Sequence, residues 1–220
     1  MQVPPGATEV LLVRHGQSAP YRDGEPFALV DGQGDPPLSD LGHRQAVAVA
    51  DRLERAGISA IYVTNLQRTH QTAAPLAARL GLQPRLEVDL REVHLGEWEG
   101  GEFRRMAAER HPAFAQMELE QDWAAIPGAE RVAAVEARVR EALVRLHRDH
   151  PDERVVAVSH GGAIGSAVAV ASGSRALAFA TADNASITHL ILHGDRWTVR
   201  RFNDTNHLGD GLSATGEGLT

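Results

Sequence analysis

The chain has 220 residues, 43% of them hydrophobic and 23% charged, and its formal net charge of −7 at pH 7 argues against non-specific binding to nucleic acid, which needs a basic face. The absence of cysteine excludes disulfides, thiolate metal sites and cysteine nucleophiles. Residues 1–9 lack a signal-peptide pattern and no apolar run approaches the roughly 20 residues that span a bilayer, so we expect a cytoplasmic protein without a membrane partner.

The first eighty residues predict strands and helices in alternation. In chain order the elements are a strand at residues 10–13, a loop at 22–37, a helix at 39–56, a strand at 58–63 and a helix at 64–80. The strands are short apolar runs, which suit strands buried on both faces. Ser39 has the position of a helix N-cap, and Thr64 with Gln67 has the spacing of a capping box, whereas Gly57 and Gly81 end the two helices.

The alternation resumes after an irregular middle segment. The remaining elements are a short strand at 86–88, a loop at 96–101, a helix at 103–110, helical turns at 112–127, a helix at 130–149, a strand at 154–158, a helix ending at 171 and strands at 185–192 and 197–202. The helix at 130–149 has the clearest apolar stripe, which includes Val135 and Val139. Little apolar material follows Asp204, and we expect residues 209–220 to be a flexible tail.

This order of elements predicts an α/β fold. We expect a three-layer α/β/α sandwich around a mostly parallel sheet, because strands that alternate with helices pair in parallel and carry their helices on both faces. The length fits a single domain over residues 1–208. Within it, residues 101–129 would form a helical cover insertion over the active site.

Two of the predicted buried strands end in a histidine followed by glycine. Arg14 and His15 end the first strand, and His160 comes directly after the strand at 154–158. Ligands of open α/β sheets bind beyond the carboxyl ends of the strands, and glycine leaves backbone N–H groups accessible to an anion. Either histidine alone is more often a hydrogen-bonded core residue, but the pair with an adjacent arginine indicates an anion site.

Arg68 lies in the first turn of the predicted helix at 64–80. The N-terminal end of a helix already favours an anion, so a cation there is unfavourable to the helix itself. The commoner fate of such a residue is a solvated surface position. Together with Arg14, however, it could clamp a phosphate group, because guanidinium groups form bidentate hydrogen bonds with phosphate oxygens.

Four motifs in order resemble those of the histidine phosphatase superfamily, which is also called phosphoglycerate mutase-like. They are Arg14-His15-Gly16, residues 65–73 (NLQRTHQTA), residues 90–100 (LREVHLGEWEG) and residues 159–162 (SHGG). Residues 35–39 and 203–208 are also similar to the family, so the resemblance covers about residues 9–208. The first motif alone is a weak signal, but four motifs in order identify the family.

The resemblance implies a phosphomonoesterase that forms a phosphohistidine and needs neither a metal ion nor a cofactor. His15 would be the nucleophile, Arg14 and Arg68 would bind the phosphoryl oxygens, and His160 with the N–H of Gly161 would complete the phosphate site. The arginines should lower the pKa of His15, because positive charge disfavours imidazolium. The expected partner is a small phosphate ester, and the oligomeric state, a homodimer included, stays open.

Hydrolysis also needs a carboxyl group that protonates the leaving alkoxide and then accepts a proton from the attacking water. The residues alone leave four candidates open: Asp89, Glu92, Glu97 and Glu99. The family pattern gives the role to Glu92, which would otherwise be read as a surface carboxylate or as an ion-pair partner of its neighbour.

Two other functions remain besides a phosphatase. A cofactor-dependent phosphoglycerate mutase of this family carries an Asn soon after the nucleophile and an Arg-Arg pair after a Trp in the cover; here Tyr21 stands near the first place and two alanines follow Trp123. Arg104 and Arg105 could substitute for that pair, although such residues on a helix flank are more often solvated. An inert phospho-ligand-binding module is disfavoured, because the full set of motif residues is present.

The leaving group should contact the loop at residues 19–37 and the cover insertion. Four acidic residues of that loop would disfavour a highly anionic leaving group and favour a substrate with a single phosphate. They are Asp23, Glu25, Asp31 and Asp35. The sequence does not identify the substrate further.

Overall fold

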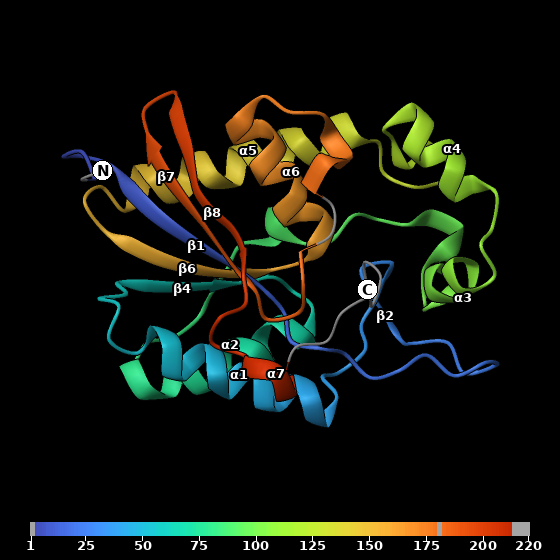
Figure 1. The fold of residues 1–220 in the computed structure, drawn as a ribbon, viewed down its shortest axis with the longest axis horizontal. Helices are drawn as coiled ribbons and strands as arrows, with labels where there is room; N and C mark the ends of the chain where they lie inside the picture. Colours follow the sequence, from blue (N-terminus) through green and yellow to red (C-terminus); the bar gives the residue numbers. More distant parts are fainter. Residues whose placement is uncertain (1–2, 180–181, 213–220) are drawn as a thin grey trace.

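A six-stranded sheet forms the middle layer of the structure, a computed structural model that describes residues 3–179 and 182–212 (Figure 1). The strands are β1 (Thr8–Arg14), β4 (Ala60–Val63), β5 (Arg85–Leu86), β6 (Arg154–Ser159), β7 (Ile187–His193) and β8 (Arg196–Asp204). Their spatial order is β5-β4-β6-β1-β7-β8. The first four run parallel, and β7 and β8 are added in antiparallel pairing, which confirms the predicted mostly parallel sheet.

Helices cover both faces of the sheet, as the predicted α/β/α sandwich requires (Figure 1). They are α1 (Asp40–Leu53), α2 (Gln67–Leu80), α5 (Val132–Asp149) and α6 (Gly161–Ser172). Val10 and Leu12 of β1 belong to the apolar cluster with α5 and α6, whereas Leu11 and Val13 belong to the cluster with α1 and α2. Alternate residues of a strand point to opposite faces, and each such burial contributes about 1.5–3 kcal/mol.

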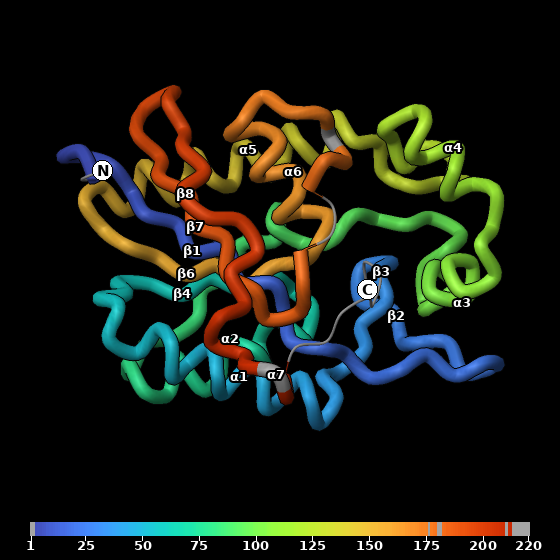
Figure 2. Tube along the Cα trace, in the orientation of Figure 1, coloured from blue at the N-terminus to red at the C-terminus, as the bar shows by residue number. Residues whose placement is uncertain are grey.

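Two segments lie beyond the carboxyl ends of the parallel strands, on the right of Figure 1, and Figure 2 traces both on that side. The loop at residues 19–37 contains a small hairpin of β2 (Leu29–Val30) and β3 (Gln33–Gly34), which the sequence did not predict. The cover at residues 101–129 contains α3 (Glu102–Ala108), α4 (Ala113–Glu120) and η3 (Trp123–Ala125). Phe103, Phe114 and Trp123 pack their rings together inside it, so the cover has an aromatic core of its own.

The capping box predicted at Thr64 is wrong. The helix α2 begins at Gln67, and no side chain at its N-cap position makes a capping bond. Asp35, from the loop at 19–37, accepts the backbone N–H of Gln67 at 2.8 Å, and its own carbonyl oxygen accepts the Gln67 side-chain amide at 2.6 Å. A cap supplied by a distant segment leaves no local spacing in the sequence, whereas Thr64 is buried beside His160.

The first residues of the predicted tail form a short helix. Leu208 is buried in the apolar cluster that the sheet forms with α1 and α2, and the helix α7 (Gly209–Leu212) follows it. The carbonyl oxygen of Leu212 accepts the Gln45 side-chain amide at 2.8 Å, which fixes this turn on α1. The rest of the predicted tail lies outside the described residues.

Three short helical turns lie where the sequence predicted loops or the end of a strand. They are η1 (Val88–Leu90), η2 (Gly96–Trp98) and η4 (Ala176–Phe179). The predicted strand at 86–88 is therefore β5 followed by a turn, and the helix predicted to reach residue 56 ends at Leu53. Across the described ranges, no helix is both long and apolar enough to cross a membrane.

Candidate active site

His15 comes directly after β1, is fully buried and has one tautomer fixed by its neighbour. Its Nδ1 lies 2.8 Å from the carbonyl oxygen of Gly16. A carbonyl oxygen can only accept, so Nδ1 carries the proton and donates it. In the described part of the chain, Nε2 has no hydrogen-bond partner, and its lone pair is therefore available to an electrophile.

The turn that holds His15 depends on two glycines in close contact. A Cβ added at Gly16 would lie 2.6 Å from the carbonyl oxygen of Gly42, and one added at Gly42 would lie 2.0 Å from that of Gln17. The N–H of Gly16 donates to the Thr72 hydroxyl at 3.0 Å. The start of α1 and the middle of α2 thus press directly on the turn after β1 and fix the backbone at His15.

Arg14 and Arg68 are both buried, at 4% and 0% exposure. Arg14 donates to the carbonyl oxygen of Ala182 at 2.5 Å. Arg68, the second residue of α2, donates from Nη1 to the carbonyl oxygen of Gly34 at 2.9 Å, and the same nitrogen lies 3.9 Å from an Asp35 carboxylate oxygen. Burial lowers the pKa of Arg68 to about 10, so the side chain remains a cation at neutral pH.

His160 is the N-cap residue of α6 and is fully buried. Its ring centroid lies 5.2 Å from that of His15. Its Nε2 lies 3.0 Å from the Thr64 hydroxyl oxygen, and its Nδ1 has no hydrogen-bond partner within the described ranges. Gly161, the first residue of the helix, is buried beside it, at the helix end that favours an anion.

Both histidines have a pKa well below the ordinary 6.5. The largest cause for each is burial, and the charge of Arg68 is the next, followed by Arg14 for His15. The sequence had indicated the effect of the arginines but not the larger effect of burial. Both rings are consequently neutral at pH 7, which is the protonation state that a histidine nucleophile requires.

Glu92 is the one of the four candidate carboxylates that lies buried beside the second histidine, with 2% exposure. Its Oε1 accepts the backbone N–H groups of Val93 at 2.9 Å and of Gly162 at 3.0 Å. Burial raises its pKa, although these hydrogen bonds and the two buried arginines act in the opposite sense. A raised pKa suits a carboxyl group that must donate a proton near neutral pH.

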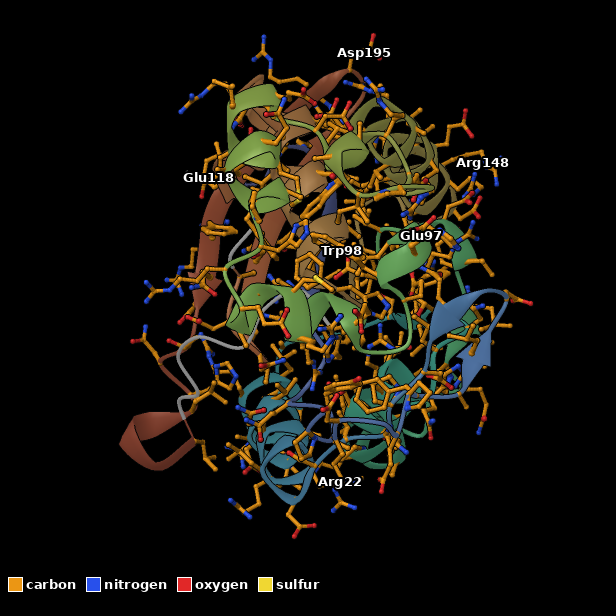
Figure 3. All side chains as sticks on the ribbon, turned by 90° about the vertical axis from the view of Figure 1, so that its right-hand side faces the viewer. Arg22, Glu97, Trp98, Glu118, Arg148 and Asp195 are labelled. Atoms are coloured by element: carbon orange, nitrogen blue, oxygen red, sulfur yellow. The ribbon has the colours of Figure 1, made fainter. Side chains whose placement is uncertain are left out.

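The other three candidates have different tasks. Asp89 pairs with Arg145 at 2.6 Å. Glu99 accepts the backbone N–H groups of Gly34 and Leu95, and so ties the hairpin of the 19–37 loop to η2. Glu97 is exposed, and Figure 3 shows it beside Trp98 on the cover side of the molecule.

Arg138 and Gln33 fix the backbone of the segment that carries Glu92. The guanidinium of Arg138, from α5, donates to the carbonyl oxygens of Asp89, Arg91 and Glu92 at 2.7 to 2.9 Å. The side-chain amide of Gln33, from β3, donates to the same Glu92 carbonyl oxygen at 2.8 Å, and its Oε1 is buried without a partner among the described residues. Neither residue was singled out from the sequence, because each acts across a fold that only the structure shows.

Arg104 of α3, which the sequence offered with Arg105 as a possible substitute for the Arg-Arg pair of a mutase, contacts the segment that follows His15. It donates to the carbonyl oxygen of Ala19 at 2.9 Å and to the hydroxyl of Ser18 at 2.6 Å. Its charge acts on His15 and on Arg68, where it lowers both pKa values. Across the described ranges, no group of three His, Asp or Glu side chains is arranged so that it could hold a metal ion.

Comparison with known proteins gives consistent matches. A family model described as the histidine phosphatase superfamily (branch 1) matches residues 10–205. Glucosyl-3-phosphoglycerate phosphatase of Mycobacterium tuberculosis is 36% identical over 166 residues, which cover 72% of each chain. Metal-independent phosphoserine phosphatase of Arabidopsis thaliana is 31% identical over 207 residues, which cover 91% of this chain and 83% of the relative. The solved native structure of the mycobacterial glucosyl-3-phosphoglycerate phosphatase superposes with a TM-score of 0.73 at 32% identity, covering 90% of this chain and all of that chain.

Proposed function

The chain belongs to branch 1 of the histidine phosphatase superfamily, and we propose that it hydrolyses phosphomonoesters of a small metabolite through a phosphohistidine at His15, without a metal ion or cofactor. It is a phosphoric monoester hydrolase that acts on phosphorylated small molecules. The observation that carries the mechanism is the buried Nε2 of His15, which has no partner among the described residues while Nδ1 donates to Gly16.

In the first step, the lone pair of His15 Nε2 attacks the phosphorus atom and the bond from phosphorus to the leaving oxygen breaks. The leaving oxygen takes the proton of the Glu92 carboxyl group, so no free alkoxide forms. The raised pKa of Glu92 favours the protonated form that this step consumes. The products are an alcohol and a phosphohistidine whose Nδ1 keeps its proton and donates it in the hydrogen bond to the Gly16 carbonyl oxygen.

In the second step, water attacks the phosphorus atom and transfers a proton to the Glu92 carboxylate. The bond between phosphorus and Nε2 breaks, and its electron pair returns to the nitrogen. Inorganic phosphate leaves with His15 neutral and Glu92 protonated, as at the start. One carboxyl group therefore serves both half-reactions in turn.

Phosphoryl transfer depends on positioning and on stabilising charge at the non-bridging oxygens. We assign this task to Arg14, Arg68, His160 and the N–H of Gly161. The lowered pKa of His160 favours a neutral ring over an imidazolium. We assign the single proton of this ring to Nδ1, because Nε2 forms a hydrogen bond with the Thr64 hydroxyl. Two permanent cations, a neutral donor and a helix N-terminus form an anion site in which the charge stabilisation comes from the protein's own groups.

Hydrolysis is favoured over a mutase reaction by the surroundings of the site. Trp123 is buried in the aromatic core of the cover, and the two alanines after it offer no charge to a substrate carboxylate. The relatives named above include two phosphatases, on glucosyl-3-phosphoglycerate and on phosphoserine, and we propose a substrate of comparable size for this chain.

Release of inorganic phosphate tests this function. The protein should release phosphate from p-nitrophenyl phosphate and from a panel of metabolite phosphates, at the same rate with and without a chelator such as EDTA. A rate that falls on chelation and returns with a divalent cation would contradict the metal-independent mechanism. Conversion of 3-phosphoglycerate to its 2-isomer with little release of phosphate would favour a mutase instead.

A further inference from the structure

Asn203, which opens the segment at residues 203–208 that resembles the family, lies in a bulge of β8. Phe202 and Asn203 together lie opposite the single Thr188 of β7, and the Asn203 N–H donates to the Thr188 hydroxyl at 3.3 Å. Asn203 has a φ of +55°, which Asn tolerates better than most other residues that carry a side chain. A bulge re-aims a side chain, and here the amide of Asn203 reaches a turn 20 residues earlier in the chain.

The side-chain amide of Asn203 makes two hydrogen bonds with Asp183 in that turn. Its Oδ1 accepts the backbone N–H of Asp183 at 2.7 Å, and its Nδ2 donates to the Asp183 carboxylate at 2.8 Å. The backbone N–H of Ser186 donates to the carbonyl oxygen of Asp183 at 3.0 Å and closes the turn. We call residues 182–186 the support turn. Asn203 therefore holds both the main chain and the side chain of one residue of the support turn.

The support turn in turn contacts Arg14 and His15. The carbonyl oxygen of Ala182 accepts from Nη1 of the Arg14 guanidinium at 2.5 Å. The backbone N–H of Ala185 donates to the carbonyl oxygen of Arg14 at 3.0 Å, and the side-chain amide of Asn184 donates to that of His15 at 3.1 Å. The support turn thus fixes the main chain at the end of β1 and, through Ala182, the direction of a phosphate-binding guanidinium.

Ala182 directly precedes Asp183, so the pair of Asn203 and Asp183 acts one residue away from the carbonyl oxygen that holds Arg14. We propose that Asn203 is a positioning residue, which orients the guanidinium of Arg14 toward the transferred phosphoryl group through Asp183 and Ala182. This inference rests on the proposed function and goes beyond it, because it gives the far strand of the sheet a part in binding phosphate.

The direction of the Arg14 guanidinium matters because its donors form a planar set that must match the phosphate oxygens. A misplaced guanidinium keeps its charge but loses part of its hydrogen bonding, which weakens the binding of phosphate. If Asn203 served only the stability of the fold, its loss would lower the free energy of unfolding and leave the phosphate affinity of the folded protein unchanged. The two roles therefore differ in the dissociation constant of phosphate.

Calorimetric titration with inorganic phosphate tests the proposal, because unfolded protein reduces the amplitude of such a titration and not the dissociation constant. Asn203→Asp keeps the acceptor for the Asp183 N–H but places two carboxylates against each other, and we expect the dissociation constant to rise about 10-fold. In the double variant Asn203→Asp/Asp183→Asn, donor and acceptor are exchanged between the two side chains, so the affinity should return near that of the wild type. Asn206→Asp, at an exposed position of the same segment, is the matched control and should bind phosphate as the wild type does.

The route through Arg14 is tested in an Arg14→Gln background. Asn203→Asp should not weaken phosphate binding further there, because no guanidinium is left to orient. Asn203→Gly, which tolerates the positive φ and adds no charge, replaces Asn203→Asp in both comparisons if the latter does not fold.

An unchanged dissociation constant in the Asn203 variant would overturn the inference, as would an equal rise in the control. A double variant that binds no better than Asn203→Asp, or an equal further loss in the Arg14→Gln background, would also contradict it. Turnover of p-nitrophenyl phosphate by the wild type separates this inference from the proposed function. If the wild type hydrolyses the ester while Asn203 has no effect on phosphate binding, only the role of Asn203 fails; if no ester is hydrolysed, the proposed function fails and this role with it.

Discussion

Glu92 accepts the backbone N–H of Gly162 through Oε1 at 3.0 Å, so the carboxyl group is held against the first turn of α6, directly after His160. A Cβ at Gly162 would lie 2.6 Å from that same oxygen and 2.6 Å from a methyl carbon of Val93. The contact therefore requires glycine, and it couples the position of the proposed acid–base group to that of the proposed phosphate site.

Gly162→Ala should displace Glu92 and lower kcat for alkyl phosphates by about 10- to 100-fold. The crowded site should also cost about 1–3 kcal/mol of unfolding free energy. Steady-state kinetics and urea unfolding would measure the two effects. Gly211→Ala is the control, because a Cβ there meets open space, and a Gly162→Ala enzyme with the kcat of the wild type would contradict this role of the contact.

Glu92→Gln should slow esters according to how much their leaving groups need a proton. Loss of a general acid typically costs about 10²- to 10⁴-fold, which we expect for alkyl phosphates. The first turnover of p-nitrophenyl phosphate should be affected much less, because p-nitrophenolate leaves without protonation. Rapid-quench measurement of the first turnover separates this step from hydrolysis of the phosphohistidine. Glu97→Gln, at an exposed neighbouring position, serves as the control, and equal slowing of both substrate types by Glu92→Gln would contradict the acid role.

Arg68→Lys should weaken phosphate binding although it keeps the charge. Lysine lacks the planar set of donors that serves the Gly34 carbonyl oxygen and phosphate oxygens at once. We expect kcat/KM to fall by about 10- to 100-fold and competitive inhibition by inorganic phosphate to weaken in parallel. Arg79→Lys, in the same helix but paired at the surface with Asp51 and Glu54, should leave both quantities near those of the wild type.

The two buried histidines should make stability depend on pH. Burial, the largest cause, and then Arg68 lower the folded-state pKa of His15 and His160, so below the ordinary value of 6.5 the unfolded chain binds protons that the folded protein does not. The free energy of unfolding is then fully retained above pH 6.5 and decreases below it, by up to about 1.4 kcal/mol per pH unit for each histidine. Glu92, whose folded pKa is raised, acts in the opposite sense and offsets part of the loss in more acidic solution.

Urea unfolding between about pH 7.5 and pH 5.5 would measure this dependence. His160→Gln should reduce the slope of unfolding free energy against pH, whereas His43→Gln, at an exposed position, should not. A slope that is the same in His160→Gln and in the wild type would show that this ring does not carry the effect.

The sequence was sufficient for the features that local patterns determine. The apolar runs before His15 and His160 predicted the strands, and a histidine that ends a buried parallel strand necessarily faces the carboxyl edge of the sheet. The choice of Glu92 among four carboxylates came from the family resemblance, and the structure supplies a physical reason, since Glu92 is the one buried beside Gly162.

The sequence was insufficient wherever a contact joins distant segments. Asp35 caps α2 from 32 residues away, so the local spacing at Thr64 predicted the wrong cap. Arg104 and Arg105 are equivalent in the sequence, and only the packing of α3 on Ser18 separates the arginine that binds the segment after His15 from the one paired on the helix. The helix at residues 209–212 is likewise held by a contact with a distant residue, the hydrogen bond from the Gln45 side-chain amide to the carbonyl oxygen of Leu212.

Trapping of a covalent phosphoenzyme tests the central claim most directly. The protein would be mixed with p-nitrophenyl phosphate, denatured within milliseconds under alkaline conditions that preserve phosphohistidine, digested and analysed by mass spectrometry. The mechanism predicts a phosphoryl group on His15, absent from a folded His15→Ala variant that also releases no phosphate. Phosphate release by His15→Ala at a rate near that of the wild type, or a phosphoryl group on another residue, would contradict it.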